Sequence, residues 1–173
     1  RDFTDKPGVY VDNQEAAYSG VTHLIDTGCR KILFLGGPKG VYTTGERLKG
    51  YRQALREAEI PFQKEYITYG AYSTASGYER VRHIIEAYPE TDAIFAGADT
   101  IAIGVLRALR ELNIPVPGQV SVLGFDNIML SADLTPALTT VAQPIYEMGY
   151  RAARKLLALI GGDPEGAKSE CMS

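Results

Sequence analysis

Three side chains in the sequence are of the types that bind a small polar molecule. Tyr72 follows a β-rich run, and its aromatic ring could cover one face of a ligand ring. Arg47, one turn into a predicted helix, offers a planar fork of hydrogen-bond donors, and Asp126 could accept hydrogen bonds from hydroxyl groups. An aromatic plate with a few charged hydrogen-bonding groups is typical of sites for sugars and other small polar rings.

No residue in the sequence stands out as a catalytic group. Asp99 and Asp126 could form a carboxylate pair for acid–base or phosphoryl-transfer chemistry, but an Asp just before a helix, such as Asp99, most often caps that helix. His23 and His83 fall within predicted helices, away from any strand end. No Gly-x-Ser-x-Gly motif supplies a hydrolase nucleophile. We expect no catalytic residues and keep an enzyme that uses the two aspartates as a rival hypothesis.

Cofactor and metal signals are equally weak. The glycine-containing loop 36–40 precedes a predicted helix, but it has neither the Walker spacing nor a Gly-x-Gly-x-x-Gly motif. Cys29 and Cys171 lie far apart, with no metal-ligand spacing around either. We therefore expect no cofactor, no metal site and no disulfide, and a reducing cytosol fits these cysteines best.

Short apolar runs alternate with helical patterns along the chain. The predicted strands are 9–11, 31–35, 66–69, 93–96, 120–125 and 138–141, and the predicted helices lie between them and over 145–160. Thr44 and either Ser73 or Ser76 are predicted helix caps, and no element is predicted from Gly161 to Ser173. This alternation indicates an α/β fold: an open parallel sheet with helices on both faces. Ligands bind such sheets at the carboxyl ends of the strands, where Tyr72 and Asp126 fall.

Charge argues against direct binding to nucleic acid or membrane. The 173 residues carry a formal net charge of −3, and the densest basic group, Arg151, Arg154 and Lys155, is typical of a solvated helix face. No apolar run is long enough to cross a bilayer. If nucleic acid matters to this protein, we expect another segment to hold it.

The predicted helix 99–112 is apolar around most of its circumference, more than one sheet face requires. Two explanations stand side by side. The helix is wedged between neighbouring elements, or it presents a second interface, most simply to a two-fold related copy of the chain.

Several motifs resemble the effector domain of lac repressor-type (LacI/GalR) bacterial transcription regulators. They lie at 28–32, 37–38, 45–51, 95–104, 116–127 and 134–141, the last two reading VPGQVSVLGFDN and LTPALTTV. The resemblance covers nearly the whole chain. It implies a two-lobed sensor similar to periplasmic sugar-binding proteins, preceded by a helix-turn-helix headpiece outside this chain. Residues 1–143 would be mainly the C-terminal lobe, and 144–173 a crossover helix and tail of the N-terminal lobe, whose sheet is largely absent here.

The resemblance also implies functional positions. Arg47, Tyr72 and Asp126, together with Thr43 and Gln143, match the effector contacts of the family.

The dimer surface of the family matches the helix after Asp99 and the segment near Leu134. The resemblance therefore implies a homodimer contact, with these residues expected in it: Ile101, Val105, Leu109, Leu134 and Pro136.

At two positions the sequence differs from ligand-binding residues of known family members, which narrows the range of expected ligands. Val41 stands where the purine repressor places a ligand-binding Arg, and Ala98 stands where the lac repressor offers an Asn to sugar hydroxyls. A purine is therefore not expected, and the particular sugars of the lac repressor need not fit.

The resulting hypothesis is a cytoplasmic, homodimeric regulator that senses a small polar effector, a sugar or similar molecule, and binds operator DNA through its headpiece. The alternative is a periplasmic solute-binding protein for transport, which would share the fold and the crevice. A dimer surface would count against that alternative, because transport receptors are usually monomers.

Overall fold

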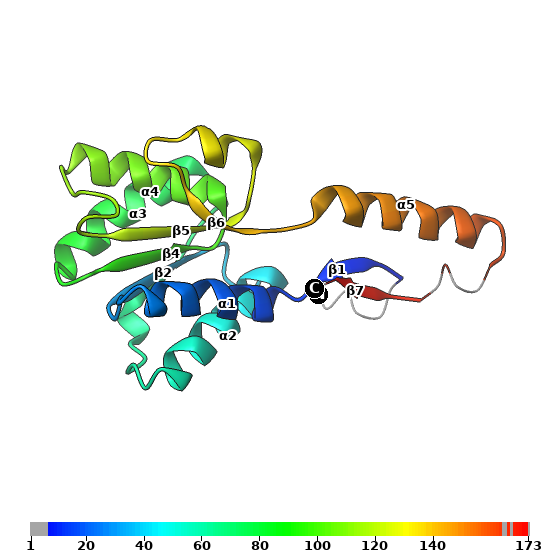
Figure 1. The fold of residues 1–173 in the computed structure, drawn as a ribbon, viewed down its shortest axis with the longest axis horizontal. Helices are drawn as coiled ribbons and strands as arrows, with labels where there is room; N and C mark the ends of the chain where they lie inside the picture. Colours follow the sequence, from blue (N-terminus) through cyan, green and yellow to red (C-terminus); the bar gives the residue numbers. More distant parts are fainter. Residues whose placement is uncertain (1–6, 164–165, 167, 173) are drawn as a thin grey trace. The chain divides into compact units, whose positions relative to one another are not determined.

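A computed structural model describes residues 7–163, 166 and 168–172 (Figure 1). The chain divides into two compact units. The larger unit is the uninterrupted stretch Asn13–Ala142, and the smaller one combines the described residues before it with those after it. The break therefore falls at 12/13 and again at 142/143.

The larger unit is built on a five-stranded parallel sheet. Its strands are β2 (Ile32–Gly36), β3 (Ile67–Tyr69), β4 (Ala93–Ala96), β5 (Ser121–Asp126) and β6 (Thr139–Ala142), in the spatial order β3-β2-β4-β5-β6. Every neighbouring pair is parallel. The predicted open parallel sheet is thereby confirmed. The chain adds β3 on one side of β2 and then crosses over to add β4 on the other side, so β2 and β4 are neighbours.

Helices cover both faces of this sheet (Figure 1). They are α1 (Asn13–Asp26), α2 (Tyr42–Glu57), α3 (Thr74–Ala87) and α4 (Asp99–Glu111), with short 3-10 turns η1 (Lys64–Tyr66) and η2 (Met129–Asp133). The pair α1 and α2 packs on one face, and α3 with α4 on the other. Because side chains alternate along a strand, Phe34 packs in the core under α1 and α2, and its neighbour Leu35 packs in the core under α3 and α4.

The apolar surface of α4 is explained within the single chain. Glycines let α3 and α4 approach closely: a Cβ atom at Gly104 would lie 2.0 Å from the carbonyl oxygen of Thr74. Ile101, Val105 and Leu109 are completely buried, each 0% exposed. These three side chains therefore pack inside the larger unit, and a role for α4 in a subunit contact stays a prediction.

The smaller unit holds β1 (Val9–Val11), α5 (Ile145–Ile160) and β7 (Glu170–Met172). The strands β1 and β7 pair in parallel, with Val9 opposite Glu170. The prediction of a structureless tail is therefore wrong at 170–172, whereas residues 164, 165, 167 and 173 of that tail lie outside the described residues. Helix α5 buries none of its side chains, and its exposed large apolar residues are Ile145, Tyr146, Tyr150, Leu156, Leu157, Leu159 and Ile160.

Two predicted helix caps have different outcomes. Ser73 caps α3, because its hydroxyl oxygen accepts a hydrogen bond from the backbone N–H of Ser76. Thr44 does not cap α2, which begins at Tyr42 after Val41. Thr44 instead lies inside the first turn and is buried.

Candidate ligand-binding site

Arg47 is held by several contacts at the carboxyl edge of the sheet. Its Nε donates to Asn13 Oδ1 (3.0 Å), and its Nη1 donates to the carbonyl oxygen of Gly97 (2.5 Å), just past the end of β4. Its Cζ lies 3.7 Å from the centre of the Phe125 ring. The residue is 5% exposed. Burial lowers the pKa of Arg47, and the nearby carboxylate of Asp126 acts in the opposite direction.

Asp126 faces the remaining nitrogen of this guanidinium. The distance between Arg47 Nη2 and Asp126 Oδ1 is 3.5 Å, and the Asp126 side chain is 25% exposed. Asp126 has a φ of 114° and Asn127 a φ of 52°. Such left-handed conformations in residues other than glycine cost roughly 1–3 kcal/mol each and cluster at functional sites. The structure thus places a partly exposed carboxylate beside a buried cation.

Tyr72 lies against backbone. A Cβ atom at Gly37 would lie 2.0 Å from Tyr72 Cζ, so only glycine leaves room for the ring there. The phenol oxygen is within hydrogen-bond distance of two hydroxyls, Thr44 Oγ1 at 2.7 Å and Thr43 Oγ1 at 3.1 Å. The two threonine hydroxyls therefore hold the phenol oxygen, and the ring packs against the backbone at Gly37, where no side chain stands in its way.

Sequence reasoning missed Thr44 as part of this group. One signal was available: Thr44 and Arg47 are three residues apart on one helix, which places them on the same helix face. The structure brings Thr43, Tyr72, Arg47 and Asp126 to one edge of the larger unit. Gln143 is the residue at which the chain returns to the smaller unit, and its part in the site stays a prediction.

Asp99 is not a helix cap and not a free carboxylate. Helix α4 is preceded by Ala98, and Asp99 is its first residue, 0% exposed. Its carboxylate accepts hydrogen bonds from Ser131 Oγ (2.7 Å), Thr140 Oγ1 (2.6 Å) and the N–H of Ile128 (2.9 Å). A completely buried carboxylate whose oxygens accept from three donors does not reach a substrate, which disfavours the paired-carboxylate enzyme.

The remaining predicted dimer residues lie at the surface of the larger unit. Pro136 is exposed, and Leu134 is half-buried against the α3–α4 core. Pro136 lines an open groove of about 320 Å³ together with Leu106 and Val116. A role for Leu134 and Pro136 in a subunit contact stays a prediction.

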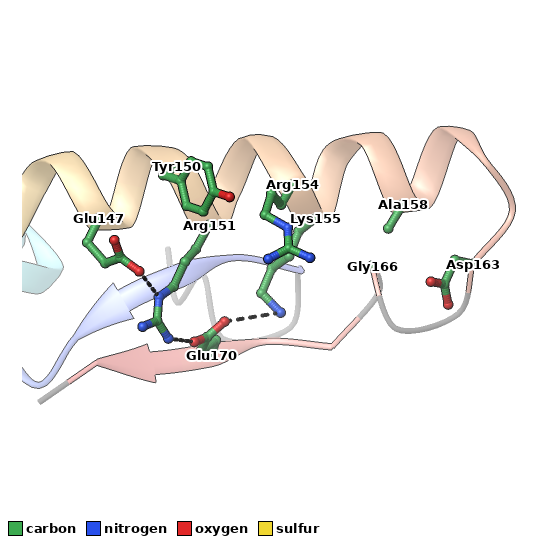
Figure 2. A pocket seen from close by; sticks show the side chains of 9 residues that line it. All are labelled: Glu147, Tyr150, Arg151, Arg154, Lys155, Ala158, Asp163, Gly166 and Glu170. Atoms are coloured by element: carbon green, nitrogen blue, oxygen red, sulfur yellow. Dashed lines mark hydrogen bonds and ion pairs between the residues drawn. The ribbon is translucent and has the colours of Figure 1, made fainter.

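Two of the three basic side chains on α5, Arg151 and Lys155, pair with carboxylates (Figure 2). Arg151 Nε lies 2.7 Å from Glu147 Oε1, and the same guanidinium pairs with Glu170 on β7. Lys155 Nζ lies 3.5 Å from the other oxygen of Glu170. Together with Arg154, these residues line a surface hollow of the smaller unit.

Within the described ranges, no group of three or more His, Cys, Asp or Glu side chains is placed to hold a metal ion. In the same part of the chain, none of the helices has the length and apolar character needed to cross a membrane.

Comparison with known proteins gives a consistent match. Residues 21–173 fit the family model described as a periplasmic binding protein-like domain. The chain is 37% identical over 151 residues to catabolite control protein A of Priestia megaterium, covering 87% of this chain and 46% of that protein. It is 34% identical over 166 residues to the HTH-type transcriptional repressor CytR of Escherichia coli K12, covering 96% and 49%. The chain spans about half the length of the curated relatives it matches.

Solved structures agree with this match. A complex of the transcriptional regulator CelR with cellobiose superposes with a TM-score of 0.90 at 32% identity, covering 98% of this chain and 51% of that one. A transcriptional regulator LacI from Bacillus cereus subsp. cytotoxis, described as putative, superposes with a TM-score of 0.92 at 35% identity, covering 99% and 61%. These proteins are regulators rather than enzymes.

Proposed function

Because this chain belongs to the periplasmic binding protein-like domains of LacI-family transcription regulators, we propose that it senses a small polar effector, a sugar or a similar molecule. The observation that carries the proposal is the prearranged group at the carboxyl edge of the sheet. Arg47 is held from two sides, faces Asp126 and shares its helix face with Thr44, which fixes Tyr72.

The charges of this group favour a neutral ligand. One guanidinium and one carboxylate lie 3.5 Å apart, so their charges nearly balance. A carboxylate accepts from hydroxyls, a guanidinium donates to them, and an aromatic ring covers the apolar face of a sugar. The similar regulator CelR forms a complex with cellobiose, a sugar and thus a member of the same chemical class.

In this proposal the larger unit is the C-terminal lobe of the sensor, and the smaller unit belongs to the N-terminal lobe. Gln143, at the second crossover, is proposed as a further effector contact. The exposed apolar side chains of α5 pack against the remainder of that lobe in the intact protein.

Regulation would follow from a shift between lobe orientations. An effector that binds one orientation better than the other shifts the population towards it. Two subunits, in contact through the region of Leu134 and Pro136, would then change whether two headpieces reach operator half-sites together. The protein would act in the cytosol. The relatives reported above are named as transcription regulators, which favours this function over transport or catalysis.

Thermal unfolding of the full-length protein tests the proposal. Cellobiose, D-glucose, D-ribose and glucose 6-phosphate are added singly at millimolar concentration. A ligand present at a hundred times its dissociation constant stabilises the folded state by about 2.7 kcal/mol, which raises the midpoint by several degrees.

Variants locate the binding site. Arg47→Ala and Asp126→Ala should abolish the shift, whereas Lys49→Ala, an exposed change on the same helix, should retain it. If no compound of the panel raises the midpoint, or if both site variants still respond, the proposed sensor site is wrong.

A further inference from the structure

Asp99 joins three separate segments of the larger unit. It starts α4, and its carboxylate accepts hydrogen bonds from Ile128 and Ser131, in the loop after β5, and from Thr140 in β6. The side chain is completely buried. Thr140 Oγ1 in turn accepts a hydrogen bond from the N–H of Asn127 at 3.3 Å. The network therefore reaches the residue that follows Asp126.

The sequence leaves room for this carboxylate. A Cβ atom at Gly124 would lie 2.1 Å from Asp99 Oδ1 and 3.3 Å from its Cγ. Any side chain at position 124 would displace the carboxylate from its donors. Glycine two residues before Asp126 is thus required by the position of Asp99 and not by the conformation of the strand.

The ion pair with Arg47 does not by itself fix Asp126. Its 3.5 Å distance is longer than the 2.7–2.9 Å of a charge-assisted hydrogen bond between a guanidinium and a carboxylate. Asp126 and Asn127 also have positive φ values, which side-chain-bearing residues adopt only when their surroundings impose them. On its N-terminal side this backbone is held by the pairing of Asp126 with Ala142 in the sheet, and on its C-terminal side it continues into the loop that Asp99 binds.

We propose that Asp99 is a positioning residue of the effector site. It holds the 126–131 segment so that the Asp126 carboxylate faces Arg47 before any ligand arrives. This inference rests on the proposed function, since the value of the arrangement lies in ligand binding. Asp99 acts through the loop and does not touch the ligand.

Hydrogen exchange measured by mass spectrometry on the full-length protein, without ligand, tests the inference. In Asp99→Ala, peptides covering 126–131 should exchange about tenfold faster, while peptides from β2 and β4 exchange as in the wild type. Asp99→Asn keeps one acceptor oxygen, so exchange in 126–131 should be faster than in the wild type and slower than in Asp99→Ala. Asp133→Ala removes an exposed acid from the same loop and should change nothing.

Milder variants keep the test decisive if Asp99→Ala unfolds. Ser131→Ala and Thr140→Val each remove one donor to the carboxylate and should loosen 126–131 by a smaller factor. The inference fails if exchange in 126–131 is unchanged in all variants, or if exchange rises equally throughout the unit. No ligand enters the experiment, so a negative sugar panel and a negative exchange result are separate outcomes.

Discussion

The guanidinium of Arg47 lies over the ring of Phe125, with Cζ 3.7 Å from the ring centre. Phe125 is completely buried in β5, and Arg47 reaches it from α2. A desolvated cation–π contact contributes about 2 kcal/mol or more. Because the ring fills one side of the guanidinium plane, the fork of donors has one orientation, and it points at Asn13, Gly97 and Asp126.

Arg47→Lys should therefore be a severe change despite keeping the charge. Lysine has no planar fork and cannot reproduce both the stacking and the paired hydrogen bonds. We expect a loss of about 2–4 kcal/mol in the free energy of unfolding, measured by urea titration, because Asn13 Oδ1 and Gly97 O lose their donors. Lys49→Arg, the reverse exchange at an exposed site of the same helix, should leave that free energy unchanged; equal effects at both positions would contradict the assignment.

The close approach of α3 and α4 predicts a strong effect of one methyl group. Gly104→Ala would place Cβ 2.0 Å from the carbonyl oxygen of Thr74, a backbone atom that cannot move aside cheaply. We expect a destabilisation of roughly 3 kcal/mol in thermal or urea unfolding. Gly45→Ala on α2 is the matched control, since nothing lies within 4 Å of its Cβ, and it should stabilise by up to about 1 kcal/mol. A neutral Gly104→Ala would show that the helices are not packed this closely.

The buried face of α4 and the surface near Leu134 should respond differently to mutation. Ile101→Ala leaves a cavity in the core and should cost about 2–5 kcal/mol of stability without changing the mass of the folded full-length protein. Leu134→Asp should lower that mass from two subunits to one at a fixed concentration in light scattering, as the proposed subunit contact requires. Two subunits in both variants would exclude Leu134 from the interface.

The contact between α5 and β7 predicts a dependence on pH. The hydrogen bond from Arg151 holds the pKa of Glu170 below its ordinary value of 4.5. A folded pKa below the unfolded one means that Glu170 stabilises the fold at pH values above the ordinary pKa, and that this contribution is lost as the pH falls through the lowered value. Carbon NMR titration of the Glu170 carboxyl should show the low midpoint, and Arg151→Met should return it towards 4.5.

Apolar patterning predicts the elements of the larger unit well, because buried parallel strands such as β2 are apolar at every position. It fails where partners are remote in sequence. The short strand β7 has no distinctive pattern, and only pairing with β1, more than 150 residues earlier, makes it a strand.

The site shows the same division between local and remote information. Tyr72 and Asp126 could be selected by type and by position at strand ends, and Arg47 by type and by position in the first turns of a helix. The contacts that fix Arg47 span 34 residues to Asn13, 50 to Gly97 and 79 to Asp126, and no local pattern encodes them. The local pattern predicts Asp99 as a helix cap, but its hydrogen-bond donors come from the loop after β5 and from β6, which are remote in sequence.

The larger unit is one unbroken stretch of chain, from Asn13 to Ala142. Near its two ends, Ala16 and Ala142 line the same groove beside β6, so the chain enters and leaves on one side. Segments with neighbouring ends tolerate excision and insertion, because a host chain can be joined to both ends without crossing the core. This stretch therefore has the topology of a cassette: exchanged as a block between related regulators, it would carry Arg47, Tyr72, Asp126 and the network that orders them into a new host in a single step.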